Sequence, residues 1–149
     1  MTDLRARVMN LEDAIRQLPG AIIGTNNGKG NGDVEHYFAN GVYCRSITIP
    51  AGMVLTGKIH RYECVNILAQ GKVAVTNPEQ EHPDILEAPH IWVSPPGSKR
   101  ALYVMEDVVW ITAHPAKKGA SEDDLEDLEK ELTANSYEQL TYEQQEMIE

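Results

Sequence analysis

Hydrophobic residues recur along the chain with different periods, and each period predicts a different element. Near the N-terminus their spacing is four, three, four and three residues, at Leu4, Val8, Leu11, Ile15 and Leu18. This spacing places them on one face of an amphipathic helix that ends at Pro19-Gly20. A helix of about 16 residues is not stable alone in water, so its apolar face must pack on something. Two alternatives stay open: packing on its own domain, or self-association through a heptad-like seam.

The middle of the chain carries short runs of apolar and alternating residues, which are typical of β-strands. The expected strands are 42–49, 53–60, 64–68, 72–75, 85–86, 90–93, 101–105 and 108–113. Turn residues separate them, including Gln70-Gly71 and Glu106-Asp107, and no helical pattern interrupts them. We therefore predict a mainly β fold, an antiparallel sandwich or barrel.

The last part of the chain changes character. Ser121-Glu-Asp-Asp124 is a variant of the capping box, and leucines then recur at helical spacing, which predicts a helix over about 122–133. Two interpretations stay open, a solvated acidic tail and a segment that orders on a partner. We expect this segment to be dispensable for folding. The predicted division of the chain is a helix (1–20), a Gly/Asn-rich linker (21–33), a β body (34–116) and an acidic helical tail (117–149).

Charge and composition exclude several classes of protein. Eleven of the 23 acidic residues fall in 122–149 beside a single lysine, so the tail carries the whole net charge of −10. That tail would repel a phosphate backbone, and nucleic-acid binding is not expected. No apolar run approaches the ~18 residues of a membrane helix, and the N-terminus lacks the apolar core of a signal peptide. Two cysteines make no disulfide framework and suit a reducing compartment.

Two motifs resemble those of the cupin superfamily, the RmlC-like jelly rolls. The stretch from Gly57 to Val75, Gly-Lys-Ile-His-Arg-Tyr-Glu-Cys-Val-Asn-Ile-Leu-Ala-Gln-Gly-Lys-Val-Ala-Val, resembles the first motif. Pro95-Pro96-Gly97-Ser-Lys-Arg100 resembles the start of the second motif. The resemblance covers about residues 40–115. It implies a cupin-type antiparallel jelly-roll barrel of roughly six to eight strands with a mouth at one end.

An enzymatic cupin binds its metal through two histidines and a glutamate of the first motif and a histidine of the second. By this resemblance His60 matches the first histidine and Glu63 lies near the glutamate position. Tyr62 replaces the second histidine, and Arg100 replaces the last one. An arginine cannot ligate a metal ion, and its charge repels one. The resemblance therefore implies no cofactor.

A further histidine would reach the mouth if 101–105 and 108–113 form a hairpin, because residue 100 then lies opposite residue 113. His114 would stand beside Arg100. Two arrangements stay open. Glu63 and Arg100 could form an ion pair across the mouth, with both histidines as hydrogen-bonding neighbours. Alternatively His60, Glu63 and His114 could hold one divalent transition metal as a two-histidine, one-carboxylate site.

The whole run also resembles small cupin-like proteins encoded by tailed bacteriophages. This resemblance implies a non-enzymatic, oligomeric virion component, a decoration, tail or adaptor protein whose partners are other copies and other virion proteins. It places the protein in a virion or the host cytoplasm, without membrane partners. The alternatives are a small metal-dependent cupin enzyme, and a protein that binds a small ligand or a host protein at a mouth lined by Arg61, Tyr62 and Arg100.

Overall fold

The computed structural model describes residues 2–17, 33–77, 79–134, 136 and 140. Helix α1 (Thr2–Arg16) is followed by the strands β1 (Asp33–Ala39), β2 (Val42–Ile49), β3 (Val54–Thr56), β4 (Ile59–His60), β5 (Cys64–Val75), β6 (Asp84–Glu87), β7 (His90–Ser94) and β8 (Ala101–Pro115). The 3-10 helix η1 (Glu122–Asp124), helix α2 (Leu125–Leu132) and strand β9 (Thr133–Ala134) come last. The mainly β, antiparallel fold class predicted from the sequence is confirmed. The predicted linker lies outside the described residues, apart from Asp33, which opens β1.

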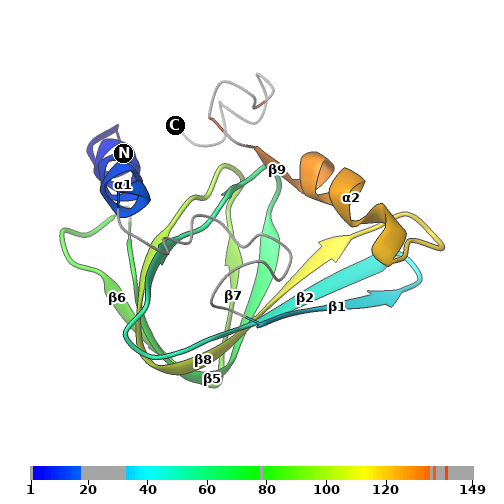
Figure 1. The fold of residues 1–149 in the computed structure, drawn as a ribbon, viewed down its shortest axis with the longest axis horizontal. Helices are drawn as coiled ribbons and strands as arrows, with labels where there is room; N and C mark the ends of the chain where they lie inside the picture. The colour runs from blue at the N-terminus through cyan, green and yellow to red at the C-terminus, as the bar shows by residue number, and fades with distance from the viewer. Residues whose placement is uncertain (1, 18–32, 78, 135, 137–139, 141–149) are drawn as a thin grey trace.

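In the described part of the chain, seven strands form one antiparallel sheet in the order β1-β2-β8-β5-β6, with β3 added to β8 and β7 added to β5. The long strands β5 and β8 lie side by side at the centre, and each pairs with two different strands along its other edge. Figure 1 shows the sheet curving up on both sides of this central pair. No pairing joins β1 to β6 among the described strands, so the sheet is curved but open.

The turn predicted at Gln70-Gly71 and the hairpin predicted around Glu106-Asp107 are absent, and both predictions are wrong. Each pair lies inside one continuous strand, β5 or β8. The register between these strands shifts around Gly71, and Lys72 pairs with Glu106. Gly71 has a φ of +92°, and a Cβ there would lie 2.1 Å from the carbonyl oxygen of Asp107. The two turn-like sequences therefore mark the two sides of one β-bulge, where both strands bend.

The concave side of the sheet carries the main hydrophobic core. Leu68 and Val73 of β5 and Val104 and Val108 of β8 are completely shielded from solvent. Alternation along the strands directs these side chains inward, and burial of each stabilises the fold by roughly 1.5–3 kcal/mol. Trp110 extends this core with its edge against a neighbouring tryptophan, at a ring-centroid distance of 4.9 Å.

Helix α1 packs on its own domain, so the first of the two alternatives for this helix is the one seen. Val8 and Glu12 form its buried face, whereas Leu11 of the predicted seam is 37% exposed. The carboxylate of Glu12 lies 2.5 Å from Lys99 Nζ and accepts a hydrogen bond of 2.8 Å from the Thr56 hydroxyl. Leu18 lies outside the described residues. Polar contacts therefore decide which face of α1 turns inward, because Glu12 displaces Leu11 from the interface.

The C-terminal segment is part of the fold, so its interpretation as a solvated tail is wrong for residues 122–134. The predicted capping box at Ser121 and Asp124 is confirmed. Leu128 and Leu132 of α2 are buried against Tyr43 on the concave side of β2. Strand β9 then pairs with β4 in a separate two-stranded sheet. The expected second helix or tail beyond Ala134 lies almost entirely outside the described residues.

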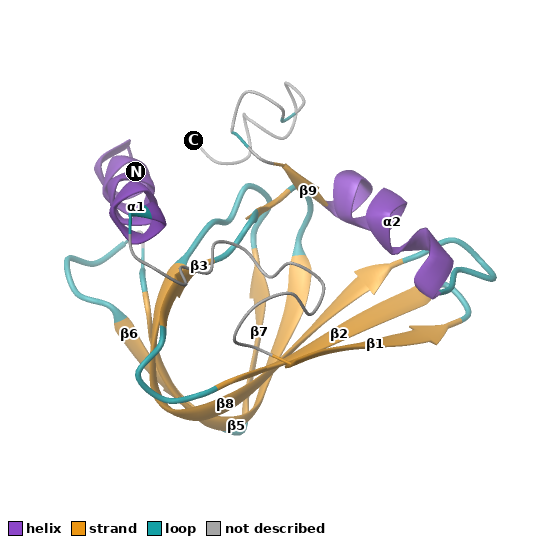
Figure 2. Ribbon diagram, viewed as in Figure 1, coloured by secondary structure: helices purple, strands orange, loops and turns teal. Residues whose placement is uncertain are grey.

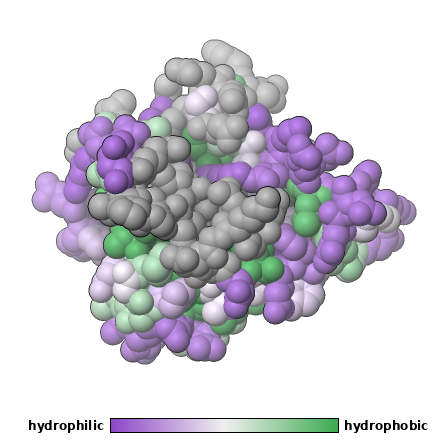
Figure 3. Space-filling model, viewed as in Figure 1, coloured by the Kyte–Doolittle hydropathy of each residue, from purple (hydrophilic) through white to green (hydrophobic). Residues whose placement is uncertain are grey.

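Both helices lie over the open side of the curved sheet, α1 near one edge and α2 near the other (Figure 2). Their outward surfaces are hydrophilic in Figure 3, as expected for helices that bury one face only. Among the described helices, none has the length and apolar character needed to cross a membrane.

Candidate functional site

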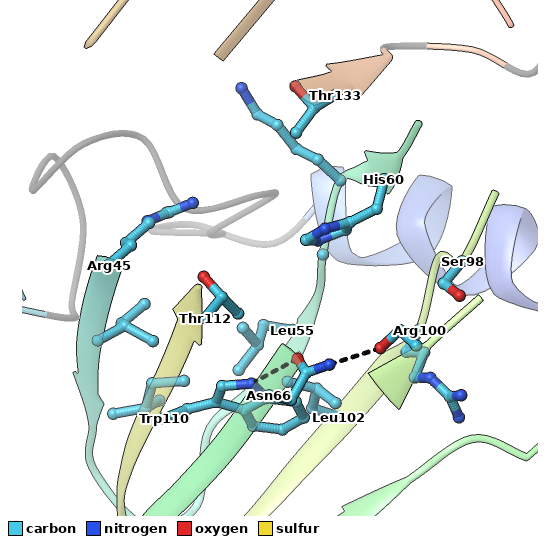
Figure 4. Close-up of a pocket in the computed structure, with 15 residues that line it drawn as sticks. Arg45, Leu55, His60, Asn66, Ser98, Arg100, Leu102, Trp110, Thr112 and Thr133 are labelled. Carbon is cyan, nitrogen blue, oxygen red and sulfur yellow. Dashed lines mark hydrogen bonds between the residues drawn. The ribbon is translucent and has the colours of Figure 1, made fainter. Parts of the chain in front are cut away.

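A pocket of about 120 Å³ opens on the concave side of the sheet, beside β4 and β9 (Figure 4). Its floor is apolar and consists of Ile47, Ile49, Leu55, Leu102 and Trp110. Its polar lining consists of Arg45, Lys58, His60, Asn66, Ser94, Ser98, Arg100, Thr112 and Thr133, with Gly57 at the edge. Alternation along β2 and β8 explains this lining, because every second residue of each strand faces the pocket.

A hydrogen-bonded network fixes the floor of the pocket. Trp110 Nε1 donates to Asn66 Oδ1 at 3.0 Å, and Asn66 Nδ2 donates to Ser94 Oγ at 2.6 Å. Figure 4 shows both bonds, which join β8, β5 and β7. Asn66 and Ser94 are buried, and a satisfied network of this kind holds the indole in one orientation.

Three cationic side chains border the pocket. Burial lowers the pKa of Arg45, Lys58 and Arg100, because it disfavours the charged form. Lys58 forms an ion pair with Glu129 of α2, and Arg100 Nη1 donates to the carbonyl oxygen of Thr76 at 2.8 Å. The guanidinium of Arg45 reaches from β2 into the pocket in Figure 4, on the side facing His60. Both arginines keep their charge, because guanidinium is not deprotonated in proteins.

Beside the pocket, His60, Cys64 and His114 come together from β4, β5 and β8. One donor atom from each lies within 4.8 Å of the other two. Cys64 Sγ is 3.9 Å from His114 Nε2, and the two imidazole rings stack at a centroid distance of 5.8 Å. Burial lowers the pKa of each histidine to about 4, with the charge of Arg45 adding to the effect. Burial raises the pKa of the Cys64 thiol to about 11.

The structure separates the residues that the sequence analysis placed at the mouth. His60 and Arg100 line the pocket, and His114 lies next to His60. Tyr62 is 49% exposed and Glu63 is also exposed, on the turn between β4 and β5. Glu63 and Arg100 form no ion pair, because Arg100 is directed to Thr76 instead. The expected charge pair across the mouth is therefore wrong.

The metal-binding positions of the enzymatic cupins are not assembled in this chain. Of the four positions that the resemblance assigns, His60 alone offers a donor atom beside the pocket, since Tyr62 and Glu63 face solvent and Arg100 is cationic. His114 reaches His60 by another route than the hairpin first expected. Val65 pairs with Ala113 between the antiparallel strands β5 and β8, which brings Cys64 and His114 together. A metal ion held in the usual cupin manner does not fit these residues.

Sequence reasoning missed Arg45, Cys64, Asn66 and Thr112 as site residues. Cys64 is buried. The signal that could have found the others is alternation, because Arg45 shares a face of β2 with Ile47 and Ile49. A charged residue at an inward position of a strand is an exception to the pattern and indicates a site.

No protein-family model matches the sequence, and no curated protein does. In structure, the chain is similar to a protein of unknown function from Vibrio parahaemolyticus, with 11% identity over 56% of this chain and 87% of the other, and a TM-score of 0.50. It is also similar to the polyketide cyclase RemF from Streptomyces resistomycificus, with 12% identity over 64% of this chain and 77% of the other, and a TM-score of 0.50.

A further similar structure is an RmlC-like cupin family protein with a double-stranded β-helix fold from Methanocaldococcus jannaschii. It is 16% identical over 56% of this chain and 79% of the other, with a TM-score of 0.47. Likeness at this identity concerns the fold alone, so any activity must be argued from the residues of this chain. The mainly antiparallel β architecture agrees with the fold class that the sequence led us to expect.

Proposed function

We propose that this protein binds a small organic acid in the pocket on the concave side of its sheet. The observation that carries the proposal is the division of the pocket into a cationic side and an apolar floor. Arg45, Lys58 and Arg100 supply positive charge, and none of the described residues that line the pocket is acidic. Clefts lined by one sign of charge attract ligands of the opposite sign.

The charge of Arg45 is the main reason to expect an anion. A carboxylate bound beside this guanidinium would form charge-assisted hydrogen bonds with it. Lys58 already contacts Glu129, so it contributes less to the net attraction. Arg100 adds a buried Nε that has no hydrogen-bond partner among the described residues. Cationic hydrogen-bond donors therefore border the pocket.

The floor and the volume limit the rest of the ligand. Ile47, Leu55 and Trp110 offer an apolar surface, and the indole is held by Asn66. A volume of about 120 Å³ is close to the ~150 Å³ of an engineered cavity that binds benzene. The pocket is smaller than the roughly 300 Å³ or more of sites for drug-sized ligands. A carboxylate on a single ring or a short branched chain fits both limits.

Titration calorimetry with benzoate tests the proposal, and benzamide serves as its neutral isostere. We expect benzoate to bind at least about tenfold more tightly, which corresponds to about 1.4 kcal/mol for one charge-assisted contact. Arg45→Gln should remove this preference, and Arg7→Gln on the exposed side of α1 should leave it unchanged. Trp110 fluorescence provides a second signal from the floor. Equal binding of acid and amide, or an unaltered preference in Arg45→Gln, would overturn the proposal, as would no binding of benzoate or isobutyrate at millimolar concentration.

The role as an oligomeric virion component stays a prediction from the sequence resemblance. Ligand binding is preferred because the pocket combines a cationic side with an apolar floor, an arrangement that a purely structural role does not require. Mass spectrometry of purified virions would test the structural role directly.

A further inference from the structure

We infer that His60, Cys64 and His114 form a binding site for a thiophilic divalent metal ion such as Zn²⁺ or Co²⁺. The three side chains come from β4, the start of β5 and the end of β8, and their donor atoms lie within 4.8 Å of one another. The ligand set differs from the one first considered, because the thiol of Cys64 takes the place of the exposed Glu63. Cys64 and His114 do not line the pocket, so this inference stands apart from the proposed function.

The spacing of the donor atoms is close to that of a tetrahedral zinc site. With Zn–S of about 2.3 Å and Zn–N of about 2.0–2.1 Å, neighbouring donor atoms are roughly 3.3–3.6 Å apart. The separation between Cys64 Sγ and His114 Nε2 is 3.9 Å, and no pair in the cluster exceeds 4.8 Å. Side-chain rotations that move each donor atom by about 1 Å or less would therefore bring all three to bonding distance around one ion.

The backbone around the cluster is fixed on several sides. Cys64 pairs with Ser94 in the sheet, and the neighbouring Val65 pairs with Ala113. The amide nitrogen of His60 donates to the carbonyl oxygen of Ser98 at 3.0 Å. Elements held in this way keep the three side chains close in the absence of an ion, which lowers the entropic cost of binding.

The chemistry of the donors selects the class of metal. A thiolate and two neutral imidazoles suit zinc, cobalt and similar ions, whereas magnesium and calcium require oxygen ligands. Arg45 opposes any cation at this position. The thiol offsets part of this opposition, because its proton leaves to solvent as the sulfur–metal bond forms, so the site gains one positive charge instead of two. A further cost is the 3.0 Å hydrogen bond between Thr112 Oγ1 and His114 Nε2, which the ion would replace.

Three protein ligands leave one position of a tetrahedral ion for water or for a bound molecule. Zinc sites of this open kind are catalytic in other proteins, whereas structural zinc sites have four protein ligands. Since His60 belongs both to the cluster and to the pocket, an ion held here would border the proposed acid-binding space.

Titration of chelator-treated full-length protein with Co²⁺ tests the inference. We expect one equivalent to bind, with a thiolate-to-cobalt charge-transfer band in the near ultraviolet and release of about one proton. Zn²⁺ should remove the band and raise the melting temperature, and Mg²⁺ should do neither. Cys64→Ser should abolish the band, and His114→Asn should weaken Co²⁺ binding at least tenfold. Cys44→Ser is the matched control, because Cys44 lies outside the cluster and the band should persist.

Absence of the band in the wild-type protein would overturn the inference, whether or not the variants fold. A band that persists in Cys64→Ser, or that disappears in Cys44→Ser, would also overturn it. A second readout in the wild-type protein is alkylation, which Zn²⁺ should slow at Cys64 and leave unchanged at Cys44. Benzoate titration of the wild-type protein separates the two proposals, because benzoate binding by protein that shows no cobalt band rejects this inference and leaves the proposed function in place.

Discussion

Glu12 and Lys99 form an ion pair inside the protein, with 2.5 Å between Oε2 and Nζ and each side chain 5% exposed. Because the pair is buried, removing Glu12 leaves the Lys99 ammonium without this acidic partner. We expect Glu12→Leu to lower the free energy of unfolding by about 3–5 kcal/mol, measured by urea denaturation. Hydrogen exchange should show lost protection in α1, because Glu12 is its main polar anchor. The double variant Glu12→Leu/Lys99→Met should recover most of the loss.

The control for this prediction is the exposed pair of Glu126 and Lys130 on α2, whose side chains are 84% and 73% exposed. Glu126→Gln should cost no more than about 0.5 kcal/mol. A double variant as unstable as Glu12→Leu alone would show that packing, and not the buried charge, accounts for the loss.

Removal of the acidic segment should destabilise the protein, in contrast to the expectation from its composition. Truncation after Gly119 exposes Tyr43 and removes the partner strand of β4, so both the melting temperature and the fraction of soluble protein should fall. Leu128→Ala isolates the packing contribution, and we expect a loss of about 2–3 kcal/mol. Glu131→Ala on the exposed side of α2 should have little effect. A truncated protein with unchanged melting temperature would contradict the burial of Leu128.

Two glycines with similar backbones should respond differently to alanine. Gly41 and Gly71 have φ of +84° and +92°, so each substitution carries a backbone cost of roughly 1–2 kcal/mol. A Cβ at Gly41 meets nothing within 4 Å, whereas at Gly71 it would lie 2.1 Å from the Asp107 oxygen. Gly71→Ala should therefore destabilise the protein by clearly more than Gly41→Ala in thermal denaturation. Equal losses would mean that β5 and β8 separate at the bulge without cost.

Acid should destabilise the metal-free protein through His60 and His114. Each has a pKa of about 4 in the folded state against 6.5 as the ordinary value. Between these values the unfolded state binds more protons, so stability rises with pH and is lost as pH falls from about 6.5 toward 4. The loss is at most about 3.5 kcal/mol for each histidine, at about 1.4 kcal/mol per pKa unit. Urea denaturation with chelator present, from pH 7 to 4.5, measures it.

Two variants check the origin of this acid sensitivity. His114→Asn should flatten the pH dependence of the unfolding free energy, because one titrating group is removed. His82→Gln should leave the dependence unchanged, since His82 is exposed in a loop. An equally steep dependence in His114→Asn would contradict the assignment to the buried cluster.

The sequence was sufficient for the fold class, the cap at Ser121 and both helix positions, because these depend on local patterns. At Gln70-Gly71 and Glu106-Asp107 the sequence pattern predicted turns, but both pairs lie inside continuous strands. A turn and a bulge both need glycine and polar residues, and only the pairing of β5 with β8 distinguishes them. That error carried over to the site, since the hairpin placed His114 beside Arg100 instead of beside Cys64.

The site residues were predicted less well, for a related reason. The motif comparison favoured Tyr62 and Glu63 because of their positions in sequence, yet both lie on an exposed turn. Arg45 lies outside both motifs, and the first motif gives Cys64 no role. The positions of both side chains at the site follow from pairing between strands that are far apart in the chain. The buried contact of Glu12 with Lys99 is equally non-local, so periodicity pointed to Leu11 instead.

The last part of the pocket lining is synthesised late in translation. Thr133 of β9 lines the pocket, and the carbonyl of Thr133 accepts a hydrogen bond from Arg61 Nε at 2.9 Å. During translation Thr133 leaves the ribosome after every strand of the seven-stranded sheet described above. A nascent chain can therefore assemble its sheet while the concave side is still accessible to small molecules. Ligand present during synthesis would meet a concave side that β9 does not yet border, whereas ligand added to the finished protein meets the complete pocket.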